Sequence, residues 1–176
     1  LDEYVDLPET HGASFRRYLR ERFVEKLPCA LRSVNFVDGT KEGIEALTKK
    51  LREDVIDIGL IGIGENTHIA FNDPPVADFN DTKPVKPVKL DEVCRNQQVN
   101  DGCFAKIDDV PKYAITLTVP MLVSAPHLFC IVPAKTKAKA VKATLCDDIN
   151  EICPATVLRR HKSAILYLDG DSSSLL

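Results

Sequence analysis

The residues best suited to chemistry gather in one short segment, Gly62-Ile-Gly64-Glu65-Asn66-Thr67-His68, and Asp73 follows closely. Histidine is the side chain whose ordinary charge change lies near neutral pH, and a carboxylate or an amide can orient its ring. The combination suits proton handling on a small substrate. A catalytic and a structural role for His68 are about equally favoured by spacing alone, since loops carry function disproportionately.

Three further features could contribute to a site. The glycines of Gly62-x-Gly64 let backbone N–H groups approach a ligand, but without a third glycine they do not indicate a dinucleotide, and a plain turn is the alternative. Lys137 lies where a predicted helix opens after a strand, a position that suits a phosphate, with a solvated helix face as the alternative. Asp2, beside Glu3, is on its own only a carboxylate near a terminus.

The elements that must position these residues follow from hydrophobic periodicity. Apolar residues recur at three- and four-residue spacing from Gly12 to Pro28 and from Gly39 to Arg52, which predicts two amphipathic helices. Val34–Val37 is predicted as a short strand. Val55–Ile63 is predicted as a longer one, apolar on both faces like a buried parallel strand. The loop with His68 leaves its carboxyl end, where open α/β sheets bind ligands.

The second half of the chain continues the alternation of strands and helices. Residues 74–109 are rich in Pro, Asp, Asn and Lys and are predicted to form loops with one short helix around Asp91 to Gln98. The pattern as a whole predicts one domain, residues 1–176, with a doubly wound, mostly parallel α/β sheet and helices on both faces. The later predicted elements are strands Ala114–Thr118, Leu128–Val132 and Ala164–Leu168, helix Lys135–Leu145, and a short helix around Ala155 to Arg160.

Composition excludes several classes of function. The 176 residues are 44% hydrophobic and 28% charged, as in a soluble domain with a substantial core. The net charge of -3 provides no positive field for nucleic acid or an anionic membrane surface, and no apolar stretch reaches membrane-spanning length. The six cysteines have no zinc-binding or Cys-x-x-Cys spacing. We therefore expect a cytoplasmic protein without a metal, a nucleic-acid partner or a membrane partner.

The segment Gly62-Ile-Gly64-x-x-x-His68-Ile-Ala-Phe-Asn-Asp-Pro74 resembles the signature loop of the glucosamine-6-phosphate deaminase/isomerase family. Leu1–Pro8, Val110–Thr118 and Lys137–Ala140 extend the resemblance over essentially the whole chain. The related 6-phosphogluconolactonases share the Gly-x-Gly…His loop, but theirs normally continues Ala-Ser-Leu-Phe-Pro, so Ala70–Pro74 favours the deaminase branch. The family's first strand, its phosphate loop and the next helix have no counterpart, and we expect that an amino-terminal portion is absent from this sequence.

The resemblance implies an activity and a set of roles. The activity is conversion of glucosamine 6-phosphate and water to fructose 6-phosphate and ammonia, through ring opening, proton transfer between C2 and C1, and imine hydrolysis, without a cofactor. Asp2 matches the proton-transferring base, and His68 matches the histidine that acts in ring opening. Asp73 matches the acidic residue, usually glutamate, that orients this histidine. Lys137 matches a phosphate-binding lysine, and Gly62 and Gly64 belong to the substrate-binding loop.

Three departures from the family pattern bear on these roles. Asn66 and Thr67 stand where the family commonly has Asp-Gly; an amide can orient an imidazole but cannot stabilise its positive charge, and threonine disfavours positive φ. The family's phosphate-binding arginine is missing near Asn100, and Arg95 is the nearby candidate. A lactonase-type hydrolase acting on a phosphorylated sugar lactone and a non-catalytic sugar-phosphate-binding module are open alternatives. The sequence also leaves open whether the chain forms a homo-oligomer.

Overall fold

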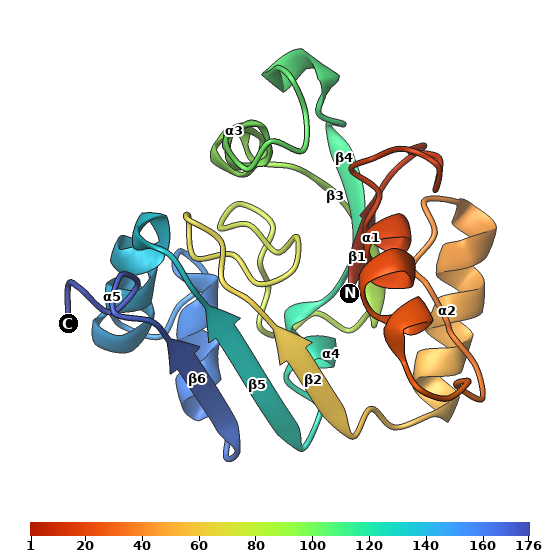
Figure 1. The fold of residues 1–176 in the computed structure, drawn as a ribbon. Coiled ribbons are helices and arrows are strands. Elements are labelled where there is room, and N and C mark those ends of the chain that lie inside the picture. Colours follow the sequence, from red (N-terminus) through yellow and green to blue (C-terminus); the bar gives the residue numbers. More distant parts are fainter.

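The strands of the computed structural model, which describes residues 1–176, form two three-stranded sheets (Figure 1). One is parallel, in the order β2-β5-β6, and the other is antiparallel, in the order β1-β4-β3. The strands are β1 (Asp2–Tyr4), β2 (Ile58–Ile61), β3 (Val85–Lys89), β4 (Tyr113–Leu117), β5 (His127–Val132) and β6 (Ala164–Leu168).

Five α-helices and four short 3-10 helices connect these strands. The α-helices are α1 (Phe15–Arg22), α2 (Lys41–Glu53), α3 (Glu92–Asn100), α4 (Val119–Leu122) and α5 (Ala138–Cys146). The 3-10 helices are η1 (Val24–Lys26), η2 (Ile107–Asp109), η3 (Lys135–Lys137) and η4 (Pro154–Arg160). Side-chain caps set where several begin: Ser14 accepts from the N–H of Arg17, and Thr40 from that of Gly43.

The predicted α/β class with a parallel sheet is confirmed, and most predicted elements are found. The helices expected between Gly12 and Pro28 and between Gly39 and Arg52 are α1 with η1, and α2. The helix expected around Asp91 to Gln98 is α3, and the one expected over Lys135–Leu145 is η3 followed by α5. The three strands predicted in the second half are β4, β5 and β6. Periodicity located these elements because each packs an apolar side against the core, although α1 and α2 contribute only partly buried residues.

The antiparallel sheet was not predicted. The strands are divided between a parallel and an antiparallel sheet and do not form the single, mostly parallel sheet that was expected. β3 lies in the segment expected to be loops and contains Pro87, which breaks a central strand but is tolerated in β3 because it is an edge strand. Val34–Val37 forms no strand and pairs with no neighbour, so β propensity alone was insufficient. The strand predicted over Val55–Ile63 is shorter, since only β2 pairs with β5.

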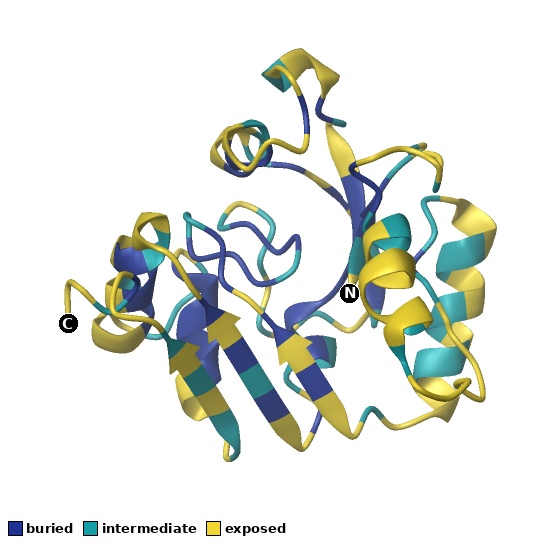
Figure 2. Cartoon of the chain, in the orientation of Figure 1, coloured by how far each residue is buried: buried dark blue, intermediate teal, exposed yellow.

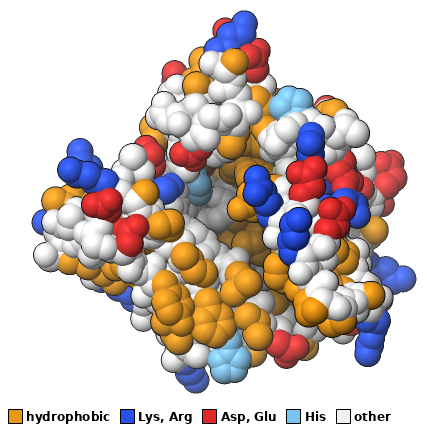
Figure 3. Space-filling view, in the orientation of Figure 1, with side chains coloured by type: hydrophobic (Ala, Val, Ile, Leu, Met, Phe, Trp, Pro, Cys, Tyr) orange, Lys and Arg blue, Asp and Glu red, His pale blue; other side chains and the backbone are white.

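Helices were expected on both faces of the parallel sheet, but within residues 1–176 they cover only one. α5 and η4 pack on that face, where Val141 and Leu158 join the core with Leu128. Along the strands, buried and exposed residues alternate (Figure 2), and Ile58 and Leu60 on the other face are 57% and 59% exposed. An apolar patch covers this face in the space-filling view (Figure 3). Strand composition marked both faces as apolar but could not show which one the chain's own helices cover.

The core has two parts, one for each sheet. Eighteen buried residues lie between the parallel sheet, α5, η4 and the adjoining end of β4. A second cluster of nine buried residues lies under α1 and α3, centred on Tyr4, whose ring contacts those of Phe15, Phe71 and Phe104. None of the helices has the length and apolar composition that crossing a bilayer requires. The two core clusters meet at the loop that follows β2.

Candidate active site

The loop after β2 joins the two sheets. It leaves the parallel sheet at Ile61 and is tied to β4 of the antiparallel sheet by Asn72, whose Nδ2 donates to the carbonyls of Ile69 and Leu117, both at 2.9 Å. Thr116 of β4 accepts a further bond through Oγ1 from the N–H of Phe71, at 3.1 Å. These buried bonds fix the loop relative to both sheets, so side chains that it carries are held rigidly.

His68 is held at its Nδ1 nitrogen. Nδ1 lies 2.6 Å from Oδ1 of Asn66 and 3.0 Å from Oδ1 of Asp73. Both of these oxygens are acceptors when Asn66 donates through Nδ2, so Nδ1 carries a proton. The His68 side chain is 11% exposed, and the residue lines the adjoining hollow. Nε2 is therefore the ring nitrogen left to exchange a proton with a ligand.

Asp73 is buried and fully engaged. Its Oδ1 accepts from Nδ2 of Asn66 at 3.1 Å as well as facing His68, and its Oδ2 accepts from the N–H of Asp91 at 3.0 Å. Burial alone would raise the pKa of Asp73, but the contact with His68 and the bonds from Asp91 and Asn66 outweigh it and hold the pKa below its ordinary range. Asp73 is thus an anion that orients His68.

Backbone geometry explains the glycine in front of His68. A Cβ on Gly64 would overlap the imidazole ring, whereas one on Gly62 would meet only the carbonyl oxygen of Ile131, at 3.5 Å. Gly64 therefore permits the position of the ring. Thr67 has a φ of 69°, the left-handed conformation that a β-branched residue disfavours, and its Oγ1 is buried without a hydrogen-bond partner. The substitution noted in the sequence thus stores strain next to His68.

Asp2 reaches the same hollow from the other sheet. A cavity of about 680 Å³ is lined by Asp2 of β1, by Gly62, Gly64 and His68 of the loop, and by Gln97 of α3. It opens on the face that appears hollowed in Figure 3. Two elements far apart in sequence thereby bring a carboxylate and an imidazole to one site. The structure thus brings Asp2, His68 and the paired glycines, Gly62 and Gly64, to one cavity.

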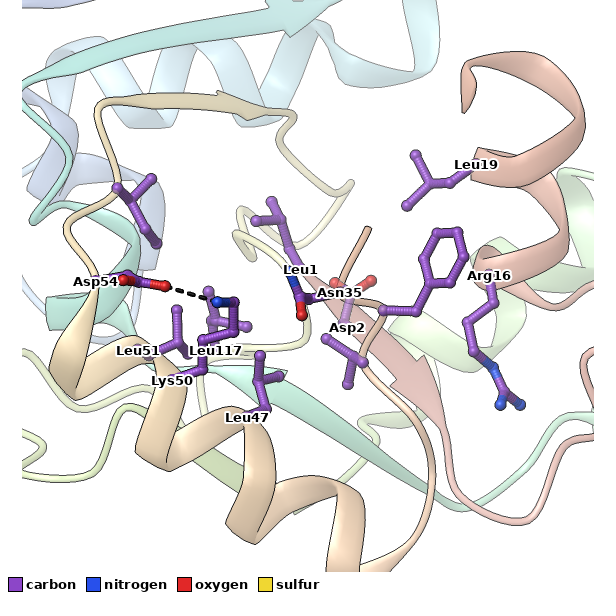
Figure 4. Close-up of a pocket in the computed structure, with 13 residues that line it drawn as sticks. Leu1, Asp2, Arg16, Leu19, Asn35, Leu47, Lys50, Leu51, Asp54 and Leu117 are labelled. Carbon is purple, nitrogen blue, oxygen red and sulfur yellow. Dashed lines mark hydrogen bonds and ion pairs between the residues drawn. The ribbon is translucent and has the colours of Figure 1, made fainter. Parts of the chain in front are cut away.

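The environment of Asp2 is largely apolar. It also borders a smaller hollow of about 280 Å³, walled by Leu19 of α1 and by Leu47 and Leu51 of α2 (Figure 4). Burial raises the pKa of Asp2 above its ordinary range, although the positive charge of His68 acts in the opposite direction. A carboxylate with a raised pKa is a stronger base, which suits proton abstraction near neutral pH.

The two cationic candidates are placed differently. Lys137 closes η3 after β5 and is half-buried; burial lowers its pKa, while the carboxylates of Asp101 and Glu65 act to raise it. Asp101 lines the cavity with His68, but Lys137 itself does not. Arg95 does not line the cavity with His68, because its guanidinium donates to the carbonyls of Ile107 and Val110, at 2.6 and 3.0 Å.

Two charged residues that support the site, Glu3 and Asp91, are absent from the site residues predicted from sequence. Glu3 is fully buried and accepts from the Ser14 hydroxyl, the N–H of Arg16 and the Arg16 guanidinium, so it joins β1 to the start of α1. Asp91 accepts from Nδ2 of Asn66 at 3.2 Å. The available signal for Asp91 was its place at the start of the helix predicted around Asp91 to Gln98, where an aspartate commonly caps, and this position does not identify a partner in a distant loop.

One cluster has the composition of a metal site. His68, Asp73 and Cys94 offer ligand atoms that lie within 4.8 Å of one another. Burial and the neighbouring Asp73 carboxylate raise the pKa of the Cys94 thiol, which disfavours the thiolate that a metal requires. Nδ1 of His68 and both oxygens of Asp73 are already used within the protein. The donor set therefore fits a hydrogen-bonded network better than a metal.

Comparison with known proteins gives consistent matches. The sequence model of a family described as Glucosamine-6-phosphate isomerases/6-phosphogluconolactonase matches residues 2–167. A glucosamine-6-phosphate deaminase of Bacillus cereus (strain B4264) is 35% identical over 179 residues, which cover 99% of this chain and 66% of the relative. The chain thus spans slightly less than two thirds of the length of the curated relatives that it matches.

Two solved structures show the same fold. A monomeric glucosamine-6-phosphate deaminase superimposes with a TM-score of 0.89 at 30% identity, covering 100% of this chain and 73% of that one. A 6-phosphogluconolactonase from Trypanosoma cruzi superimposes with a TM-score of 0.70 at 18% identity, covering 99% of this chain and 70% of that one. At that lower identity the likeness shows the fold alone.

Proposed function

The chain belongs to the family of glucosamine-6-phosphate isomerases and 6-phosphogluconolactonases, and we propose that it acts on the deaminase side of that family, converting glucosamine 6-phosphate and water to fructose 6-phosphate and ammonia. The observation that carries this proposal is the meeting of Asp2 and His68 in one cavity, the first from β1 and the second from the loop after β2. An aldose-ketose isomerisation needs a base at the carbon skeleton and a proton carrier at the ring oxygen.

The proposed reaction begins with ring opening. His68 passes the proton of the anomeric hydroxyl to the ring oxygen through Nε2, because Nδ1 is held by Asn66 and Asp73. The sugar is then an open-chain aldehyde that bears the amine on C2. Asp73, an anion with a lowered pKa, stabilises the charge that develops on the imidazole during this transfer.

Asp2 is the proposed base for the second step. Its carboxylate removes the proton from C2, and the electron pair moves through C1 to the carbonyl oxygen, which takes up a proton to give an enolamine. Return of a proton to C1 yields the imine at C2, so that the substrate's own nitrogen stabilises the intermediate. Water adds to C2 and ammonia leaves, giving the ketone. The raised pKa of Asp2 makes its carboxylate a stronger base for removing the C2 proton.

Lys137 is the proposed partner of the substrate phosphate. It lies where a strand ends and a helix begins, it is half-buried, and the carboxylate of Asp101, which lines the cavity, influences its pKa. Binding of a dianionic phosphate would offset the cost of burying this ammonium group. We propose no phosphate contact for Arg95, because its guanidinium is used by backbone carbonyls.

The relatives that are 35% and 30% identical both carry the name of a deaminase, which supports this branch over the lactonase.

The six cysteines are free, which supports a reducing, cytoplasmic location.

Ammonia release from glucosamine 6-phosphate, assayed beside acid release from 6-phosphogluconolactone, tests the activity. Asp2→Asn should lose exchange of the C2 proton with solvent deuterium while keeping its fold. Asp6→Asn, which removes the charge of an exposed carboxylate nearby, is the matched control and should exchange normally.

Retained exchange in Asp2→Asn would remove Asp2 from the mechanism. Acid release from the lactone without ammonia release would assign the protein to the other branch. A rise in Tm on adding glucosamine 6-phosphate, without turnover of either substrate, would favour the non-catalytic binding module instead.

A further inference from the structure

Asp91 occupies an N-cap position that its side chain does not use. It precedes α3 with the extended φ and ψ of a cap, -64° and 150°, yet makes no side-chain capping bond. Ser14, Thr40 and Thr118 cap their helices with their side chains in the usual way. Aspartate is among the preferred capping residues, and such a bond contributes about 1 kcal/mol. The carboxylate forgoes it and instead accepts from Nδ2 of Asn66, at 3.2 Å.

The Asn66 amide lies between two carboxylates and His68. Nδ2 donates to Oδ1 of Asp73 at 3.1 Å and to Oδ2 of Asp91, so each of its two hydrogens has a negatively charged acceptor. Oδ1 accepts from the backbone N–H of His68 at 3.2 Å and lies 2.6 Å from Nδ1. Rotating the amide by 180° would set its oxygen against two carboxylate oxygens and its NH₂ against a backbone N–H. The surrounding charges therefore fix the orientation of the amide.

The orientation of the amide decides the tautomer of His68. Nδ1 faces an amide oxygen and a carboxylate oxygen, so a ring protonated only on Nε2 would place lone pairs against lone pairs. Gly64, which lacks a Cβ, lets the ring lie in the plane that this contact requires. The neutral ring thus carries its hydrogen on Nδ1 and presents a free lone pair on Nε2.

We propose that Asp91 is a positioning residue: it orients the Asn66 amide and thereby holds His68 in the tautomer whose Nε2 accepts a proton. Asp73 accepts only one of the two amide hydrogens of Asn66, through the Oδ1 that also faces His68, while its Oδ2 accepts from the N–H of Asp91. Asp91 is the acceptor that serves the second amide hydrogen. The effect of Asp91 on turnover rests on the proposed function, whereas its effect on the His68 tautomer does not.

The test is long-range proton-nitrogen NMR of the full chain labelled with ¹⁵N-histidine, at alkaline pH, with the His68 signals assigned by His68→Gln. The wild-type protein should show a protonated Nδ1 and a bare Nε2. Asp91→Ala should show a mixture of tautomers and a kcat lowered about tenfold, with KM unchanged, as expected for one lost hydrogen bond to a charged group. Asp91→Asn keeps an acceptor oxygen and should retain the wild-type tautomer.

Two controls separate positioning from helix stability. Glu92→Ala removes an exposed carboxylate from the first turn of the same helix without touching Asn66, and should leave the tautomer unchanged. In an Asn66→Ala background, Asp91→Ala should have no further effect on the tautomer, because Asp91 acts through the amide. An unchanged His68 tautomer in Asp91→Ala would overturn the proposal, as would an equal change in Glu92→Ala. Absence of ammonia release by the wild-type protein would count against the proposed function alone.

Discussion

The loop that carries His68 differs from the two cationic candidates, Lys137 and Arg95, in how firmly the side chains are held. His68 has two acceptors at Nδ1, and the acceptors are themselves bonded to one another and to Asp91. Lys137 is half-buried and is influenced by carboxylates on two other segments, without an ion pair. Arg95 is firmly held, but by backbone carbonyls away from the cavity.

The difference reflects what each part must do. Proton transfer requires the reacting atoms to be placed to within a few tenths of an ångström of the productive geometry. The groups that transfer the proton therefore benefit from a rigid network formed before the substrate arrives. The charge of a phosphate dianion is spread over several oxygens, and the ammonium group of a lysine, on its flexible stem, can reach any of them. For phosphate binding, a positive charge near the site therefore matters more than a fixed geometry. The loop should therefore be sensitive to small steric changes, and the phosphate side to removal of charge.

The largest expected effect comes from breaking the loop geometry. Gly64→Ala places a methyl group against the imidazole and should lower turnover by about 100-fold, the cost of displacing a reacting group by about 1 Å. Gly170→Ala, whose Cβ would meet no atom within 4 Å and which does not line the cavity, is the control and should be close to wild type. The ammonia-release assay checks both. Equal activities would show that the ring position is not critical.

Removing charge from the phosphate side should affect binding instead. Lys137→Gln should raise KM for glucosamine 6-phosphate by about 10- to 100-fold, the value of one charge-assisted hydrogen bond, with little change in kcat. Lys139→Gln, an exposed lysine on the next turn, is the matched control and should change neither constant. A fall in kcat at constant KM in Lys137→Gln would contradict the division between the two parts.

A smaller effect should follow from releasing strain in the loop. Thr67→Gly replaces a β-branched residue at φ 69° and removes a buried hydroxyl without a partner. We expect the relief of backbone strain and of the unpaired hydroxyl to outweigh two costs, the loss of the buried methyl group and the greater flexibility of glycine in the unfolded chain. The free energy of unfolding should therefore rise by about 1 kcal/mol. Ala134→Gly, at φ 83° and exposed, relieves only the backbone and should gain less. Denaturant titration measures both, and a destabilised Thr67→Gly would refute the strain.

The smallest effect concerns acid stability. The pKa of Asp73 is lowered in the folded state, so its contribution to stability is present above its unfolded pKa of about 3.9 and is lost as the pH falls through the folded value. Asp73→Asn should therefore flatten the decline of stability with acid. Asp78→Asn, at an exposed position, should leave that decline unchanged. Urea midpoints measured across the acidic range would test this, and parallel pH curves for Asp73→Asn and wild type would contradict it.

The residues predicted from sequence for the two parts of the candidate site differ in whether they lie at the cavity. The loop was found because a glycine pair, a histidine and a carboxylate lie within a dozen residues after an apolar strand, so local spacing carried the information. Arg95 was chosen only because it lies near Asn100, and the structure places its guanidinium elsewhere. Two residues that lie close together on a helix can have side chains that point in different directions, so nearness to Asn100 in sequence did not place the Arg95 side chain at the site.

The sequence by itself determined the α/β class, the main helices and the loop with His68, because periodicity, capping and glycine placement act over a few residues. The tertiary structure decided the antiparallel pairing that brings Asp2 beside β4, the covering of only one face of the parallel sheet, and the use of Asp91 by Asn66. Each of these depends on contacts between segments far apart in the chain. Such contacts follow from topology, which local propensity does not specify.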